Sequence, residues 1–143
     1  MLGIIFSLVA GALMSFQGVF NTRLSDKIGN SEANMFIQGS GFLLSLVLFF
    51  FIKNGNLKKI AEVNKLYLLG GVIGVLIVYT VIQGMRSLGP AYAVAIILIS
   101  QLLTAAAIDA FGLFDTKHVS FGFSKIIGLV VMILGVIIFK LKG

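Results

Sequence analysis

The sequence contains no cysteine and a single histidine, His118, so it cannot form a disulfide or a zinc site of the usual kind. It is also poor in charge, because 11% of its 143 residues are charged, against about 25% in soluble domains. The apolar share is 59% and the mean hydropathy is +1.11, which predicts a membrane protein. No nucleophile–base pair is visible, so we expect neither an enzyme nor a bound cofactor or metal.

Five apolar stretches are long enough, or nearly so, to cross the membrane, which takes about 20 helical residues. The predicted spans are residues 2–24, 33–52, 66–85, 91–111 and 120–139. Asn, Asp and Gly in residues 21–32 predict the first loop, and the basic link 53–65 could form a short interfacial helix. The loops leave no room for a soluble domain, so we predict one all-α integral membrane domain over residues 1–143.

Positive charge is nearly balanced across the predicted membrane. Six basic residues fall on the side of the N-terminus and five on the other: Lys53, Lys58, Lys59, Lys65, Lys117 and Lys125 against Arg23, Lys27, Arg86, Lys140 and Lys142. Since Lys and Arg set orientation, this difference gives little bias. One interpretation is dual topology, with the same chain inserted both ways and paired as an antiparallel homodimer. The other is an orientation fixed by the first helix or by the basic link.

The basic residues that give the chain its net charge of +6 lie between the apolar segments, so we expect them to contact membrane lipid and not nucleic acid. Small residues recur along three of the predicted helices. Gly70 and Gly74 lie one turn apart, and Gly128 and Gly135 lie seven residues apart. The first helix carries a stripe about 120° wide, formed by Gly3, Ser7, Gly11, Ser15, Gly18 and Thr22. Such faces let helices approach closely, within one chain or between chains.

Several polar side chains lie at membrane depth. Ser100 and Gln101 lie near the middle of the fourth predicted helix, Gln17 and Asn21 are one turn apart on the first, and Tyr79 is in the third. Buried polar groups must be paired or face a wet cavity. Two interpretations are open: these residues line a substrate cavity, or they form interhelical hydrogen bonds worth about 0.6–2 kcal/mol each.

Asp109 lies eight residues beyond Gln101, about 12 Å along the helix, near the hydrocarbon boundary. It could exchange a proton or pair with a cation during transport, or it could be an interfacial acid that reaches a headgroup or a lysine. The negative charge of Glu32 is expected to stabilise the start of the second helix through the helix dipole. Arg86 is expected to anchor the end of the third helix at the membrane boundary. No acid occupies the centre of a predicted span, which argues against cation binding by a central carboxylate.

Four sequence features resemble the YdcZ-like family of the drug/metabolite transporter superfamily: Gln17-x-x-x-Asn21-x-x-Leu24, Leu88-Gly89-Pro90-Ala91, Gln101-Leu102 with Asp109-x-x-Gly112-Leu113, and Gly128 to Gly135-Val136. The resemblance covers nearly the whole chain. It implies five spans that form a half-repeat and pair as an antiparallel, inverted dimer. One departure is Ala110, where a larger or polar residue is expected after the aspartate. The central Glu of small multidrug resistance proteins also has no counterpart.

Together these features predict a small secondary-type transporter of a bacterial inner membrane. A dual-topology antiparallel homodimer, or a pair with a related and oppositely oriented chain, would work by alternating access. Asp109 would bind a coupling ion or gate the cavity. The unidentified small-molecule substrate would be bound by Gln17, Asn21, Tyr79, Ser100 and Gln101. The alternatives are a dual-topology ion channel and a non-transporting membrane scaffold or partner subunit.

Overall fold

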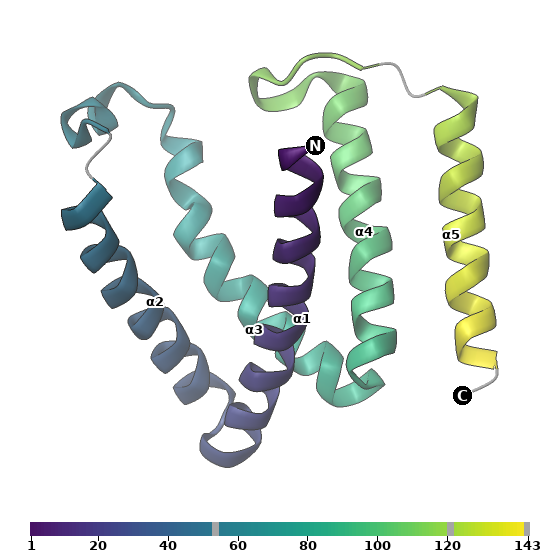
Figure 1. Cartoon of the computed structure of the whole chain (residues 1–143), viewed down its shortest axis with the longest axis horizontal. Coiled ribbons are helices and arrows are strands. Elements are labelled where there is room, and N and C mark those ends of the chain that lie inside the picture. Colours follow the sequence, from purple (N-terminus) through teal and green to yellow (C-terminus); the bar gives the residue numbers. More distant parts are fainter. Residues whose placement is uncertain (53–54, 120–121, 142–143) are drawn as a thin grey trace. The chain divides into compact units, whose positions relative to one another are not determined.

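A computed structural model of the chain describes residues 1–52, 55–119 and 122–141, and its regular structure is entirely helical (Figure 1). The α-helices are α1 (Leu2–Ile28), α2 (Asn30–Ile52), α3 (Gly70–Leu88), α4 (Pro90–Phe111) and α5 (Phe123–Leu141). All five are long and apolar enough to cross a membrane, α3 when it is counted from Lys65. The predicted all-α fold with five membrane-spanning helices is therefore confirmed.

The turn between α1 and α2 is tighter than the sequence predicts. In place of a loop over residues 21–32, Gly29 alone separates the two helices. Gly29 has φ 96° and ψ 157°, a conformation that residues with a Cβ rarely adopt. Its N–H donates to the Ser25 carbonyl at 3.0 Å, and its carbonyl accepts from the Ala33 N–H at 3.1 Å. One glycine with positive φ thus reverses the chain, and the neighbouring polar residues stay in the helices.

The link between α2 and α3 contains two short 3₁₀ helices, η1 (Leu57–Glu62) and η2 (Lys65–Leu69), where a short interfacial helix was predicted. Each is capped by an asparagine side chain. The side-chain Oδ1 of Asn56 accepts from the Lys58 N–H at 3.0 Å, and the Oδ1 of Asn64 accepts from the Leu66 N–H at 3.1 Å. Lys53, counted in the charge balance, lies outside the described residues, as does Lys142.

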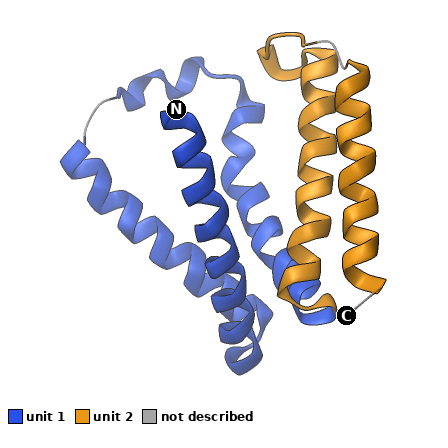
Figure 2. Cartoon of the chain, turned by 45° about the vertical axis from the view of Figure 1, so that its right-hand side comes forward, with its two compact units in different colours: residues 1–87 blue, residues 88–143 orange. Residues whose placement is uncertain are grey.

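The chain divides into two compact units, residues 1–87 and 88–143 (Figure 2). In the first, α1 and α2 form a hairpin that also contacts α3. In the second, α4 and α5 lie side by side (Figures 1 and 2). The Lys140 ammonium lies 4.9 Å from the centre of the Tyr92 ring. In each membrane-length segment, at most 6% of the residues in an 18-residue apolar window are buried, so most of the apolar surface is available to lipid or to another protein.

The segment after α4 folds back onto the end of that helix. Gly112 adopts the left-handed conformation, with φ 58° and ψ 37°, and closes α4. The Asp109 carbonyl then accepts a hydrogen bond from the Val119 N–H at 3.0 Å. These contacts fix the backbone of Asp109 next to the loop that leads to α5. Residues 120 and 121 of the predicted fifth span lie outside the described residues, and α5 runs from Phe123 to Leu141.

Candidate functional site

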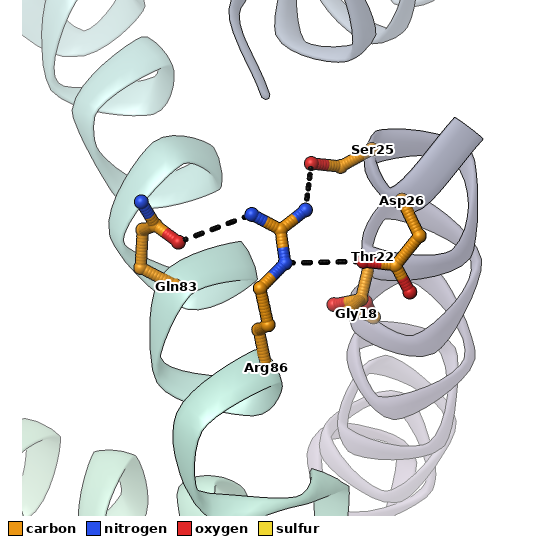
Figure 3. Close-up of polar contacts among 6 residues, drawn as sticks. All are labelled: Gly18, Thr22, Ser25, Asp26, Gln83 and Arg86. Atoms are coloured by element: carbon orange, nitrogen blue, oxygen red, sulfur yellow. Dashed lines mark hydrogen bonds and ion pairs between the residues drawn. The ribbon is translucent and has the colours of Figure 1, made fainter. Parts of the chain in front are cut away.

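Arg86, near the end of α3, is held by two residues of α1 (Figure 3). Its Nε donates to the Asp26 carboxylate at 3.0 Å, and its Nη2 donates to the Ser25 hydroxyl at 2.7 Å. A longer contact of 3.4 Å joins Nη1 to the side-chain oxygen of Gln83. Because Ser25 is buried and the two charged side chains are 40% exposed, the cluster lies at the edge of the packed region. The predicted anchor Arg86 thus joins the C-terminal ends of α1 and α3.

The small-residue stripe on α1 meets α3 at one point. A Cβ built on Gly18 would collide with the Met85 thioether, whose sulfur would lie 2.8 Å away, so this glycine allows a close approach. Gly3 and Gly11 have no such neighbour within 4 Å in the described parts of the chain. The hydroxyls of the stripe donate to carbonyls four residues earlier in α1: those of Ser7, Ser15 and Thr22. The N-terminal part of the stripe is therefore open to another helix.

A groove of about 530 Å³ lies between α1 and α2, within the first unit. Its polar side chains are Gln17 and Asn21 from α1 and Ser40 from α2, and its apolar lining is Phe20, Leu24, Phe36, Ile37, Gly41 and Leu44. Asn21 is buried, whereas Gln17 is exposed. No hydrogen bond within the described ranges involves the Gln17 side chain. The structure thus brings two predicted substrate contacts to one groove and leaves the Gln17 amide available for a partner.

Asn34 provides a second polar contact inside the first unit. Its side-chain Nδ2 donates to the Val75 carbonyl of α3 at 2.8 Å, and the residue is buried. Its Oδ1 is buried without a hydrogen-bond partner, as are both amide atoms of Asn30 one turn earlier. The contact between α2 and α3 is therefore polar as well as apolar.

A second groove, of about 520 Å³, lies between α4 and α5, within the second unit. Its charged lining residues are Asp109, in the last turn of α4, and Lys125, in the first turn of α5. The other lining residues are apolar: Leu102, Ala105, Ala106, Gly128, Leu129 and Met132. Asp109 is half-buried, and among the described residues its carboxylate makes no hydrogen bond or ion pair. Asp109, which was predicted to lie near the mouth of a cavity, therefore lines the same groove as Lys125.

The remaining predicted substrate residues do not line either groove. Tyr79 is exposed on α3, and Ser100 and Gln101 are exposed near the middle of α4. The Ser100 carbonyl accepts a hydrogen bond from the Thr104 hydroxyl at 2.9 Å, within the same helix. A substrate-binding role for these three residues stays a prediction.

The predicted packing glycines differ in their surroundings. Gly74 approaches α2, since a Cβ built on it would lie 3.9 Å from the side-chain nitrogen of Gln38. Gly70, Gly128 and Gly135 have no neighbour within 4 Å in the described residues, although Gly128 lines the groove between α4 and α5. These three glycines present open helix surface. The described residues contain no group of three or more His, Asp or Glu side chains that could hold a metal ion.

The family comparison covers almost the whole chain. A family model described as "Putative inner membrane exporter, YdcZ" matches residues 2–138. The chain belongs to the YdcZ family. That description and the five apolar helices identify a multi-pass protein of the inner membrane. No curated protein and no solved structure gave a significant match.

The structure of this YdcZ-family chain also places residues that the sequence analysis did not single out. Asp26 and Ser25 bind Arg86, Asn34 joins α2 to α3, and Lys125 lines the groove that contains Asp109. A signal for Lys125 was present, because it is the first base of an otherwise apolar helix. The partners of Arg86 and Asn34 lie about 60 and 41 positions away in sequence, and local patterns carry no information on such pairs.

Proposed function

We propose that this YdcZ-family chain is one half of a secondary transporter that exports a small molecule across the inner membrane. Two copies would pair in opposite orientations, or one copy would pair with a related and oppositely oriented chain. The pair would work by alternating access around a site near the membrane midplane. The chain would be a carrier rather than an enzyme, and would need no cofactor.

The observation that carries the proposal is the Gln17 side chain in the groove between α1 and α2. Gln17 lies two residues from the midpoint of α1, about 3 Å along the axis. An amide at this depth without a hydrogen bond is costly in hydrocarbon, so a wet cavity, a solute or a facing chain must satisfy it. Asn21, one turn away in the same groove, supplies a second amide. A solute that forms hydrogen bonds would bind between them.

Antiparallel pairing suits the depths of the polar residues. Ser100 and Gln101 flank the midpoint of α4, and residues at a helix midpoint keep their depth when a copy is inverted. Two inverted copies would therefore place these residues, with Gln17, near one central layer. Asp109 lies near the end of α4, so in two inverted copies the two Asp109 side chains would lie at opposite sides of the membrane, one at each entrance to the site. There Asp109 would bind a coupling ion or act as a gate. Tyr79 would add ring contact.

Three further features support a paired chain. In each membrane-length segment, at most 6% of the residues in an 18-residue apolar window are buried inside one copy. Gly11 and Ser15 on α1, and Gly128 and Gly135 on α5, have helix surface open to a partner. The basic residues are divided six to five between the two sides, so neither orientation is strongly preferred.

Single-cysteine labelling tests the orientation, because the chain has no cysteine of its own. Gly55→Cys places a thiol in the α2–α3 link without removing the Asn56 cap, and a Cβ there meets no atom within 4 Å. Ser87→Cys reports the opposite side of the membrane. With an impermeant maleimide applied to intact cells, each variant should react to about half of its level after permeabilisation, as two orientations require. Labelling of one variant only would rule out the antiparallel homodimer.

Transport is tested by the efflux of tritiated neutral, zwitterionic and anionic solutes from proteoliposomes. We expect saturable efflux of at least one class, and Gln17→Ala should slow it about fivefold to tenfold, the effect of one lost hydrogen bond. Ser45→Ala is the matched control, because the Ser45 hydroxyl donates to the Gly41 carbonyl of its own helix. Discrete conductance steps across a planar bilayer would instead identify an ion channel. The absence of any flux would favour a scaffold or partner subunit.

A further inference from the structure

The groove between α4 and α5 is charged at one end and apolar along the rest of its length. Asp109 and Lys125 belong to the turns of α4 and α5 nearest the connecting loop. From Asp109 to Leu102, and from Lys125 to Met132, the lining extends seven residues along each helix, about 10 Å. Ala105, Ala106 and Gly128 leave space between the two helices because alanine has only a methyl group and glycine has no side chain. The volume of about 520 Å³ is typical of a site for a small molecule.

The two charges at the end of the groove determine which occupant it favours. One carboxylate and one ammonium sum to no net charge, so a simple cation would meet Lys125 and a simple anion would meet Asp109. The half-buried Asp109 carboxylate makes no hydrogen bond or ion pair within the described ranges and can accept one from a ligand. A purely apolar occupant, such as a helix face or a lipid tail, would match neither charge.

We propose that this groove binds a zwitterionic amphiphile, a small molecule with an ammonium and an acidic group at one end and a single apolar tail. Asp109 holds the ammonium, Lys125 holds the acidic group, and the tail lies along Ala105, Gly128 and the residues beyond them. The proposal goes beyond the proposed function, because it places a second solute site at Asp109, apart from the groove that contains Gln17 and Asn21. There the ammonium of the zwitterion takes the place of a coupling ion. The apolar length of about 10 Å is shorter than half of the hydrocarbon core, so it fits one short tail better than the two chains of a phospholipid.

Protection of a single thiol tests this site directly. Gly128→Cys places the thiol on the groove wall, where a Cβ meets no atom within 4 Å. Ser124→Cys is the matched control, one turn closer to the start of α5 and outside the groove lining. Purified protein in detergent is treated with N-ethylmaleimide, with or without 2-aminooctanoic acid. Octylamine and octanoic acid serve as the cationic and anionic comparisons, and added phosphatidylethanolamine serves as the lipid comparison.

We expect 2-aminooctanoic acid to slow the modification of Gly128→Cys about tenfold at saturation and to leave Ser124→Cys unchanged. Octylamine and octanoic acid should protect weakly. Adding Asp109→Asn should weaken protection by the zwitterion and strengthen protection by octanoic acid. Adding Lys125→Gln should instead strengthen protection by octylamine. This exchange of preference is specific to a charge-matched site, because loss of the fold would abolish protection by all three compounds.

Three results would overturn the proposal. The first is no protection of Gly128→Cys by 2-aminooctanoic acid, and the second is equal protection by 2-aminooctanoic acid, octylamine and octanoic acid. The third is protection by phosphatidylethanolamine, added without the zwitterion, that equals protection by 2-aminooctanoic acid. If Gly128→Cys does not fold, Ala105→Cys reports from the opposite wall of the same groove. The assay needs no gradient and no second copy. Protection without solute flux would support the site and overturn the transporter proposal, whereas flux without protection would overturn the site alone.

Discussion

The Nε atom of Arg86 lies 3.0 Å from the carboxylate of Asp26, which joins the C-terminal end of α3 to that of α1. Both side chains are 40% exposed, so water screens much of their attraction. The second contact of Arg86, to the buried Ser25 hydroxyl at 2.7 Å, is shorter and better protected. The guanidinium therefore joins the two helices through one ion pair and one hydrogen bond.

A double-mutant cycle at this pair should give a small coupling. We expect the free energies of unfolding of Asp26→Asn, Arg86→Gln and the double variant to yield a coupling of about 0.5 kcal/mol, as is usual for exposed pairs. Arg86→Gln should cost more than Asp26→Asn, because it also removes the bond to Ser25. Unfolding in mixed detergent micelles measures each value. Single effects that add within error would show that the ion pair contributes nothing in solution.

Enlarging Gly18 should separate α1 from α3. Gly18→Leu places a side chain where the Met85 thioether lies, and we expect it to lower the free energy of unfolding by about 1–3 kcal/mol. Gly11→Leu is the control, seven residues earlier on the same stripe and without a neighbour within 4 Å in the described residues. At a high ratio of detergent to protein, where copies are separated, the control should be at least as stable as the parent chain, because leucine favours a helix more than glycine does. Equal losses in the two variants would contradict the close approach at Gly18.

Alanine should have opposite effects at two glycines near α2. Gly29→Ala must adopt φ 96° and would also meet the Glu32 carboxylate, so we expect a loss of about 1–3 kcal/mol. Gly39→Ala lies inside α2 with no neighbour within 4 Å, and should gain about 0.5–1 kcal/mol from its higher helix propensity. Thermal unfolding followed by circular dichroism compares the two. A neutral Gly29→Ala would show that the turn relaxes to another conformation.

Removing the Asn34 side chain should weaken the contact between α2 and α3. Asn34→Ala loses the 2.8 Å hydrogen bond to the Val75 carbonyl, and we expect a cost of about 0.6–2 kcal/mol. Ser45→Ala is again a suitable control, because its lost bond lies within one exposed helix. If Asn34→Ala has the same free energy of unfolding as the parent chain, the cost of burying the unpaired Oδ1 cancels the stability that the Nδ2 hydrogen bond contributes.

The membrane-spanning helices could be predicted from the sequence because apolar length is a local property. The predicted ends of the second and fourth spans, residues 52 and 111, coincide with the ends of α2 and α4. The first turn was less predictable. Asn21, Ser25 and Asp26 are typical of loops, yet Gly29 alone makes the reversal, and these residues remain in α1.

The candidate site could be predicted only in part. The one-turn spacing of Gln17 and Asn21 predicted a shared face, and both line one groove. That Asp109 and Lys125 line one groove depends on how α4 and α5 pack side by side. Sequence spacing does not determine that packing. The roles of Tyr79, Ser100 and Gln101 stay predictions.

The one-residue turn at Gly29 also bears on how the protein enters the membrane. Helices α1 and α2, so closely joined, would insert together as a hairpin, and its tip would cross to the far side in a single step. The tip carries two positive and two negative side chains, Arg23 and Lys27 with Asp26 and Glu32. Since the membrane potential acts on net charge, at about 2.3 kcal/mol per charge per 100 mV, it does almost no work on this tip. Translocation of the hairpin would then proceed with similar ease from either starting orientation.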